Sequence, residues 1–322
     1  MKILIIGTGV IGSVYGWQLF ESGNDVTHFV RKGKKQMIEK QGIHIRCLDM
    51  RVGEKNHKEV LYKPKIVEDI YEDANYDLII VPVKANQLSS ILPIISKTNN
   101  NSDILILQNI WIENIKEIES YLIESKVFFG QPHIMGGGKD EDSIYCTIFG
   151  SKDAPTMLGQ KDGKITHRLL KVAEVMNQAK LNPKVSKNML TWLYTHYAES
   201  VGLLAGVMKA GSGEKYVKQD DFIKLSILIV REGYKVCRAV GIPIWKAFPQ
   251  VLYYLPISLL LPQLKKMFSS KETQLMIKGH ISHSPDEMKE MFYKVLNMGE
   301  KLNISMPNYR NVKKYIDEFT VN

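Results

Sequence analysis

The start of the chain carries the pattern that most limits what it can fold into. The apolar run Ile3–Ile6 is followed by Gly7, Gly9 and Gly12 in a G-x-G-x-x-G pattern. Short continuous apolar runs are typical of strands buried on both faces of a parallel sheet. In such a unit the first glycine permits a tight turn, the second lets a pyrophosphate approach the backbone, and the third allows close packing of helix on strand. The pattern therefore predicts the opening unit of a dinucleotide-binding α/β domain.

The residues around these glycines favour a dinucleotide site over an ordinary glycine turn. A helix is expected over Ser13–Ser22 and a second strand over Asp25–Val30. The residues that lead into the helix, Val10 and Ile11, would offer backbone N–H groups to the phosphates. A strand before the glycines and a helix after them is the context that the motif requires.

The end of the second strand indicates which dinucleotide is bound. An NAD site usually has an acidic residue about twenty positions after the glycines, where it binds the ribose 2′-hydroxyl. The segment His28–Lys35 contains no carboxylate there, and it carries Arg31 and Lys32 instead. A guanidinium can grip a 2′-phosphate with two hydrogen bonds. NADP(H) is therefore the predicted cofactor, and a solvated basic loop is the alternative.

Composition excludes several classes of function. The chain has 322 residues and a formal net charge of +9, but its lysines are scattered, which argues against nucleic acid as a partner. Cys47, Cys146 and Cys237 lack metal-ligand spacing and cannot all pair, so a reduced, cytoplasmic setting is expected. No signal peptide is expected before the first strand. The most apolar stretch, Val251–Leu264, is too short to cross a membrane and contains two prolines.

Strand and helix patterns alternate over the first half of the chain, which predicts a doubly wound parallel sheet of the Rossmann type. The expected strands after the second are Ile43–Cys47, Val60–Tyr62, Asp77–Val83, Asp103–Leu107, Val127–Gly130 and Ile144–Phe149, the last antiparallel near the sheet edge. The expected helices between them are Lys34–Lys40, Gln87–Ser96, Trp111–Tyr121 and Ile165–Ala179.

Strand patterns nearly vanish after Ser186, where the second domain is placed. The boundary gives a Rossmann-type domain over residues 1–186 and a mostly helical domain over 187–322. Its expected helices are Asn188–Leu204, Asp220–Val240, Pro285–Leu302 and Tyr309–Phe319.

Ligands of open α/β sheets bind beyond the carboxyl ends of the strands. Three polar residues follow expected strands of the first domain, namely Lys84, Asn109 and His133. We therefore expect these residues on the rim of a cleft that faces the second domain.

Taken together, these features resemble the ketopantoate reductases, which are NADPH-dependent enzymes of pantothenate biosynthesis that reduce 2-dehydropantoate to pantoate. The resemblance rests on the Gly7-x-Gly9-x-x-Gly12 turn, Arg31, Val83-Lys84-Ala85, Leu107-Gln108-Asn109 and the helical second half. It implies that Arg31 binds the 2′-phosphate and that Lys84 and Asn109 line the nicotinamide and substrate region.

The sequence departs from that family in the second domain. The family's catalytic lysine lies two residues after a tryptophan, and here Trp192 is followed at that spacing by Tyr194. Four further family positions, an Asn-Gly glycine, two asparagines and a serine, are occupied by Ile110, Ala198, Gly202 and Leu275. Glu287, which the resemblance places on the substrate hydroxyl, is retained.

Reduction of a carbonyl requires a proton donor, and several residues are candidates. Lys84 could donate the proton or only contact the cofactor. Tyr194 could donate through its phenol, but a packed aromatic residue is slightly favoured. Glu287 could equally be an acid in the first turn of a helix, stabilised by the helix dipole.

Four histidines are also candidates. His133 is either an acid or a hydrogen-bonded turn residue, and the pair His196 and Glu199 can share a helix face, although a solvated pair is the commoner arrangement. His280 and His283 form no metal motif, so no metal is predicted.

The sequence thus predicts an NADPH-dependent reductase of a 2-oxo acid or a related small carbonyl compound. The alternative is an NADPH-binding sensor or scaffold that has lost catalysis through the altered Trp192–Gly202 helix. The expected partner is the small-molecule substrate, with a homodimer left open.

Overall fold

The computed structural model divides the chain into two compact units, Met1–Leu190 and Thr191–Asn322, close to the boundary expected at Ser186. It describes residues 1–52, 56–71, 74–98, 101–132, 135–140, 143–150, 154–271, 273–275, 277 and 285–319. His133, His280 and His283 lie outside these residues. Each unit is described by itself.

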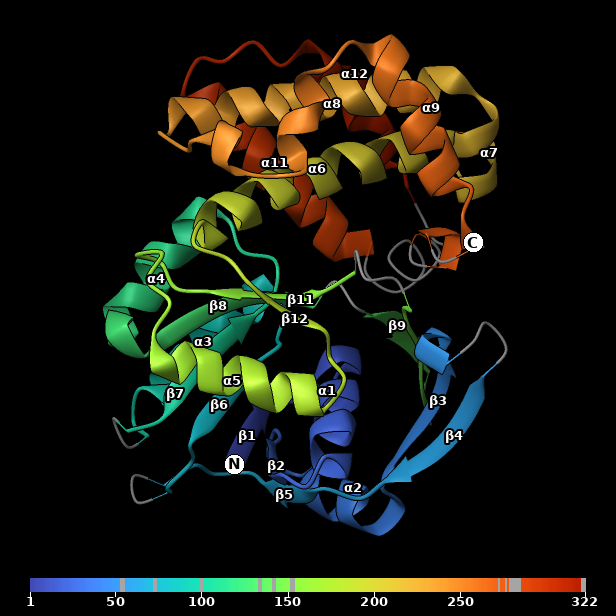
Figure 1. Cartoon of the computed structure of the whole chain (residues 1–322). Coiled ribbons are helices and arrows are strands. Elements are labelled where there is room, and N and C mark those ends of the chain that lie inside the picture. Colours follow the sequence, from blue (N-terminus) through green and yellow to red (C-terminus); the bar gives the residue numbers. More distant parts are fainter. Residues whose placement is uncertain are drawn as a thin grey trace. The chain divides into compact units, whose positions relative to one another are not determined.

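The N-terminal unit is built on an eight-stranded sheet with the strand order β12-β11-β8-β7-β6-β1-β2-β5 (Figure 1). All neighbouring strands are parallel except β11 and β8. In this order the strands are β12 (Pro183–Val185), β11 (Thr156–Gly159), β8 (Val127–Pro132), β7 (Asp103–Leu107), β6 (Leu78–Val81), β1 (Lys2–Ile6), β2 (Asp25–Phe29) and β5 (Lys65–Val67). The predicted doubly wound, parallel-dominated sheet is thereby confirmed.

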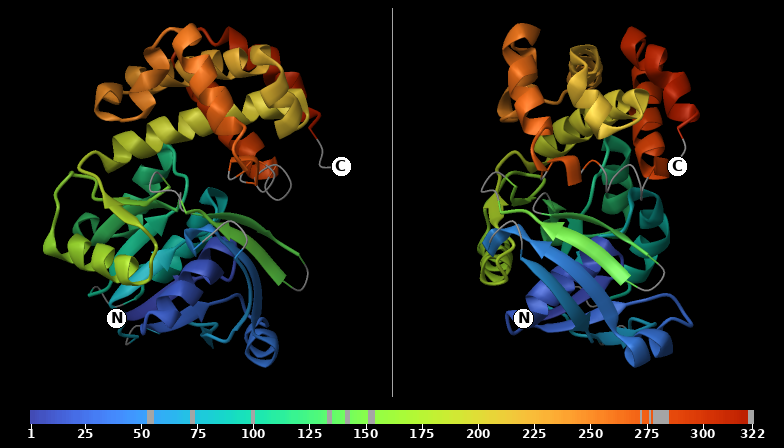
Figure 2. Two further views of the ribbon diagram at one scale, coloured as in Figure 1. Left: turned by 45° about the vertical axis from the view of Figure 1, so that its right-hand side comes forward. Right: turned by 90° about the vertical axis from the view of Figure 1, so that its right-hand side faces the viewer.

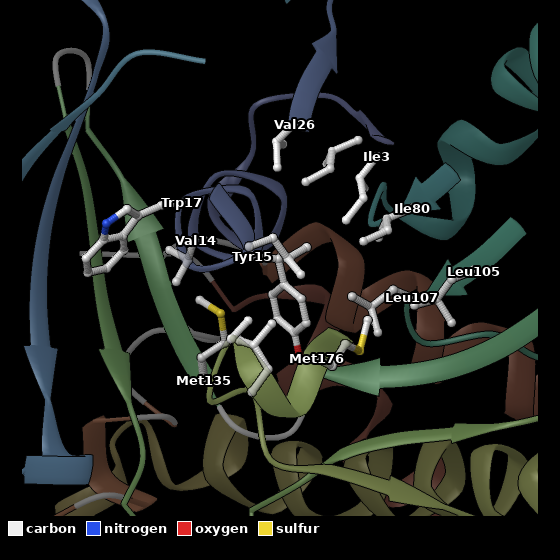
Figure 3. Close-up of a cluster of buried hydrophobic side chains, with 14 of the residues drawn as sticks. Ile3, Val14, Tyr15, Trp17, Val26, Ile80, Leu105, Leu107, Met135 and Met176 are labelled. Atoms are coloured by element: carbon white, nitrogen blue, oxygen red, sulfur yellow. The ribbon is translucent and has the colours of Figure 1, made fainter. Parts of the chain in front are cut away.

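Helices connect these strands in the expected alternation. They are α1 (Val10–Glu21), α2 (Lys35–Gln41), α3 (Leu88–Ile95), α4 (Ile112–Tyr121) and α5 (His167–Gln178). Side chains from β1, β6, β7, α1 and α5 meet in one hydrophobic core, where Ile3, Tyr15 and Met176 are fully buried (Figure 3).

Tyr15 shows how the polar atoms of this core are satisfied. Its hydroxyl lies 2.6 Å from the Thr156 hydroxyl, which donates to the Leu181 carbonyl at 2.7 Å. The Thr156 oxygen therefore accepts from Tyr15, and the bond ties α1 to β11, next to the edge strand β12.

A second, four-stranded sheet has the order β4-β3-β10-β9. Its strands are β4 (His57–Tyr62), β3 (Ile43–Asp49), β10 (Ser143–Ile148) and β9 (Met135–Lys139). The blue strands β3 and β4 run beside the green strands β9 and β10 in both views of Figure 2. The stretch Ile144–Phe149 is antiparallel to β9 as expected, but it lies in this separate sheet and not near the edge of the main one. It is held there by parallel pairing with β3, whose alternating apolar residues share the hydrophobic core.

The described part of the C-terminal unit is helical. Helix α6 (Met189–Ala210) enters it, and α7 (Gly213–Lys218), α8 (Asp220–Ala239), α9 (Ile257–Phe268), α11 (Pro285–Lys301) and α12 (Pro307–Asp317) follow. Helix α8 is the centre, because α7, α9, α11 and α12 all pack against it. The apolar stretch Val251–Leu264 is divided between the 3-10 helix η5 (Gln250–Tyr254) and α9. Among the described residues, no helix combines the length and apolar character needed to cross a bilayer.

Buried Glu232 of α8 fixes the start of α12. Its carboxylate accepts hydrogen bonds from the backbone N–H groups of Asn308 and Tyr309 at 3.1 Å and from the Asn308 amide at 2.6 Å. A carboxylate at a helix N-terminus satisfies N–H groups that have no partner within the helix.

Candidate cofactor site and active-site residues

The glycine-rich turn between β1 and α1 has the geometry expected for a phosphate cradle. Gly7 has a φ of +91°, which favours glycine. A Cβ atom at Gly9 would meet nothing within 4 Å, so open space lies over the backbone where a ligand could approach. A Cβ at Gly12 would lie 3.0 Å from the Gly7 carbonyl oxygen and 3.3 Å from Ile5 and Pro82 side chains. The residues present therefore fit a dinucleotide pyrophosphate.

The N-terminus of α1 faces the same turn. The first bond within the helix runs from the Ser13 N–H to the Gly9 carbonyl at 2.9 Å, and no side chain caps the helix. The N–H groups of Val10, Ile11 and Gly12 therefore precede the helical ladder and are available to an anion. The first turn also contains no acidic residue that would repel one.

His28 is part of this site and was missed by the sequence analysis. It lies on β2, is fully buried, and places its Nδ1 atom 2.9 Å from the Gly7 carbonyl oxygen. Its Nε2 atom lies 3.2 Å from the Tyr62 hydroxyl. Burial lowers the pKa of His28 to about 4, although the bond to Gly7 opposes this shift. The sequence signal that could have indicated its role is a histidine within a buried strand.

Arg31 follows β2 and is exposed. Its carbonyl accepts from the Lys34 N–H at 3.2 Å, which makes the basic segment a turn. Within the described residues its guanidinium has no ion pair, whereas Lys32 lies 3.9 Å from Asp69. The nearby carboxylate of Glu68 accepts from the Lys35 N–H at 2.8 Å and so caps α2. Neither carboxylate is therefore engaged with Arg31.

Strands β6 and β7 run parallel to β1 and lie next to it in the sheet. Lys84 and Asn109, which follow β6 and β7, therefore lie at the carboxyl ends of the strands, as the glycine turn does. Lys84 is extended, with φ −63° and ψ 151°, and precedes a 3-10 turn over Ala85–Gln87. Both side chains are half-buried. Ile110, where the family resemblance expects glycine, is buried and leads into α4.

Two buried amides at this edge were also missed. Leu107 pairs with Gly130 in the parallel ladder, so the next residues, Gln108 and Gln131, lie side by side on one face. Both side chains are buried, and in the described part of the chain neither amide oxygen has a hydrogen-bond partner. Unsatisfied buried amides are costly, and here they adjoin Asn109.

In the C-terminal unit, the face of α6 that carries Tyr194, Ala198 and Gly202 packs closely on α8. The Tyr194 carbonyl accepts from the Cys237 thiol at 3.8 Å. A Cβ at Gly233 would lie 3.0 Å from that of Ala198, and one at Gly202 would clash with the α8 backbone. Tyr194 is itself buried. The small residues that replace the two family asparagines thus serve helix packing.

His196 and Glu199 do not form the solvated pair that was expected. Their side chains are only 15% and 17% exposed, and His196 Nδ1 lies 4.0 Å from a Glu199 carboxylate oxygen. The His196 ring stacks on Trp192 at 4.7 Å. Burial raises the pKa of Glu199 to about 7, and hydrogen bonds from Tyr253 and Gln250 only partly offset this shift. The pair is buried because η5 covers α6 at this point.

Glu287 lies in the first turn of α11 and is half-buried. This position agrees with an acid stabilised by the helix N-terminus, and it leaves the carboxylate partly accessible. Within the described residues, no three His, Cys, Asp or Glu side chains are arranged to hold a metal ion.

Known proteins resemble the chain in sequence and in fold. The sequence model of the family described as "Ketopantoate reductase PanE/ApbA" matches residues 3–152. A 2-dehydropantoate 2-reductase of Aquifex aeolicus is 22% identical over an alignment of 331 residues, gaps included. The alignment covers 98% of this chain and 96% of the relative. These findings confirm the resemblance to the ketopantoate reductases, from which this chain has diverged in sequence.

Solved structures show the same fold. The 2-dehydropantoate 2-reductase from Geobacter metallireducens superimposes with a TM-score of 0.76 at 17% identity, covering 99% of this chain and all of the other. A D-mandelate dehydrogenase, solved with NADH and anilino(oxo)acetate, gives a TM-score of 0.72 at 22% identity, covering 98% of this chain and 97% of the other.

Proposed function

We propose that this chain, whose residues 3–152 match the sequence model of the ketopantoate reductase family, is an NADPH-dependent reductase of a 2-oxo acid or a related small carbonyl compound. The observation that carries the proposal is the set of residues at the carboxyl ends of the central strands of the main sheet. The glycine turn, Lys84 and Asn109 follow three adjacent parallel strands, at the edge where ligands of open α/β sheets bind.

The N-terminal unit supplies the groups that would hold the cofactor. The N–H groups of Val10, Ile11 and Gly12 would bind the pyrophosphate, and Arg31 the 2′-phosphate. When bound, NADPH supplies the hydride that reduces the carbonyl carbon. NADPH is proposed over NADH because Arg31 has no ion pair in the described residues and Glu68 is engaged in capping α2.

Lys84 and Asn109 would act on the substrate. An ammonium near the carbonyl oxygen stabilises the negative charge that develops on it, and it can also donate the proton. The Asn109 amide can orient the carbonyl compound through hydrogen bonds. Glu287 is proposed as a further contact to a substrate hydroxyl, as the family resemblance implies.

The substrate class is proposed more broadly than ketopantoate. The named relatives favour 2-dehydropantoate, but Tyr194, Ala198 and Gly202 replace three polar side chains of that family, and their helix face packs on α8. A structural neighbour was solved with anilino(oxo)acetate, an amide in which an oxo group lies beside a carboxylate. The altered residues of α6 support a substrate whose side chain differs from that of ketopantoate, and the neighbour's ligand supports an oxo group next to a carboxylate.

The test is NADPH consumption by the purified protein over a panel of 2-oxo acids that includes ketopantoate. We expect turnover of at least one 2-oxo acid, with NADPH used in preference to NADH. Tight NADPH binding without turnover of any member would contradict the reductase and leave only a nucleotide-binding protein.

A further inference from the structure

A buried histidine lies directly beneath the glycine turn. His28 pairs with Ile5 of β1 and with Ile66 of β5, so its strand is flanked on both sides. Its relative exposure is 0%. A polar ring in such a position is costly unless its nitrogen atoms have hydrogen-bond partners.

The two partners of His28 fix its tautomer. The Gly7 carbonyl can only accept a hydrogen bond, so the Nδ1 atom, 2.9 Å away, must carry the proton. The ring is neutral near pH 7, because burial lowers the pKa of His28 to about 4. Nε2 is then an acceptor, and the Tyr62 hydroxyl at 3.2 Å donates to it.

The hydrogen bond from His28 Nδ1 to the Gly7 carbonyl is one of two that hold Gly7 in place. The Gly7 N–H donates to the Phe29 carbonyl at 2.8 Å, and the Gly7 carbonyl accepts from His28. Both backbone groups of the residue with φ +91° are therefore held by β2. The peptide groups that follow Gly7 lead directly into the N-terminus of α1, so their direction depends on this anchoring.

Two further residues keep the ring in place. A Cβ atom at Gly16 would lie 2.4 Å from His28 Nε2, so α1 has no side chain where the imidazole sits. Tyr62, at the end of β4, is 2% exposed and approaches the ring edge-on at 5.7 Å between centroids. The second sheet thus supports the turn through one hydroxyl.

We propose that His28 is a positioning residue for the dinucleotide. Its neutral, Nδ1-protonated ring, oriented by the Tyr62 hydroxyl, holds the Gly7 carbonyl and so sets the direction of the pyrophosphate-binding amides. The inference rests on the proposed nucleotide binding, and it goes beyond it by assigning a role to a residue whose two ring nitrogen atoms are both engaged with protein groups.

Two variants separate this role from packing. His28→Leu keeps an apolar filling but removes the donor, and we expect affinity for NADPH and for NADH to fall alike by about tenfold. His28→Asn places an amide N–H near the Nδ1 position, and its affinity should remain within about threefold of the wild type. Both cofactors share the pyrophosphate, so the ratio of their dissociation constants should not change. The matched control is His44→Leu, because His44 on β3 is exposed.

Dissociation constants and melting temperatures are measured together. Folded His28→Leu protein that binds both cofactors as the wild type does would overturn the proposal, as would His28→Asn protein as weak as His28→Leu. A wild-type protein that binds neither cofactor would overturn the proposed function itself.

Nitrogen NMR of the wild-type imidazole tests the tautomer without any variant. We expect a neutral ring protonated at Nδ1 at pH 7. A ring protonated at Nε2 alone would contradict the proposal even if the leucine variant failed to fold.

Discussion

At the scale of single residues, the proposed preference for NADPH over NADH depends on Arg31. Arg31→Asp should weaken NADPH binding by roughly ten- to a hundredfold, the effect of losing a charge-assisted hydrogen bond, and NADH binding much less. Titration with each cofactor measures the difference. Lys40→Asp is the control, since it makes the same change of charge at the exposed far end of α2. Equal losses for both cofactors in the Arg31 variant would contradict the assignment.

Replacing Gly9 should impair dinucleotide binding, whereas replacing Gly12 should impair stability. Gly9 has φ −72° and open space around its Cβ position, so Gly9→Val should fold but lose dinucleotide binding, because the side chain fills the cradle. At Gly12 a Cβ meets backbone, so Gly12→Ala should lower the melting temperature. Melting curves and cofactor titrations of both variants check this contrast. A Gly9→Val protein that binds NADPH normally would show that the turn does not hold phosphate.

The residues that the sequence could not assign owe their roles to distant partners. In the sequence, His28 is a single polar residue within a predicted strand. Only the fold brings Gly7 and Tyr62 to its two ring nitrogen atoms. The amides of Gln108 and Gln131 likewise become neighbours through strand pairing. In contrast, the glycine turn was predictable because its geometry is determined locally.

At the scale of elements, the stretches with long periodicity or continuous apolar runs were predicted well. Strand β7 has the expected bounds, and the long helices α8 and α11 end within a residue or two of the expected positions. Strands β5, β11 and β12 were missed because strands of three or four residues carry too little periodicity to be recognised. Their extended conformation comes from pairing with strands distant in sequence.

Glu199 on α6 should make stability depend on pH. Its folded-state pKa of about 7 lies above the ordinary value of 4.5, so the folded protein retains a proton that the unfolded chain releases. Glu199 should therefore contribute a fall in the free energy of unfolding of up to roughly 3 kcal/mol as pH rises from about 4.5 to about 7. Buried His28, whose pKa is lowered to about 4, contributes in the opposite direction, so the Glu199 contribution is measured as a difference between wild type and variant. Denaturant titrations across this range measure the slope.

Glu199→Gln should remove the Glu199 contribution, because the amide does not titrate, so its free energy of unfolding relative to that of the wild type should rise with pH over this range. Glu214→Gln is the control, since Glu214 is exposed on α7 and should leave the slope unchanged. A Glu199→Gln protein with the wild-type pH profile would show that another group is responsible.

At the scale of the whole molecule, the residues proposed to bind the cofactor and those at the positions where the resemblance expects a proton donor lie in different units. The glycine turn, Arg31 and Lys84 all lie in the N-terminal unit. Tyr194, on α6, lies in the C-terminal unit and is buried. The division into two units could be predicted from the loss of strand patterns. The close packing of α6 on α8 could not, because it depends on contacts of Gly202 and Gly233 with residues of another helix.

The most direct test of the account is the rate of NADPH consumption, with the best 2-oxo acid of the panel, in wild type and Lys84→Ala. We predict that Lys84→Ala lowers kcat by about a hundred- to ten-thousandfold while NADPH binding is preserved, because the ammonium stabilises or protonates the developing alkoxide. Lys97→Ala, at the exposed far end of α3, should be unaffected. Unchanged turnover in Lys84→Ala would contradict the placement of the chemistry at this edge of the sheet.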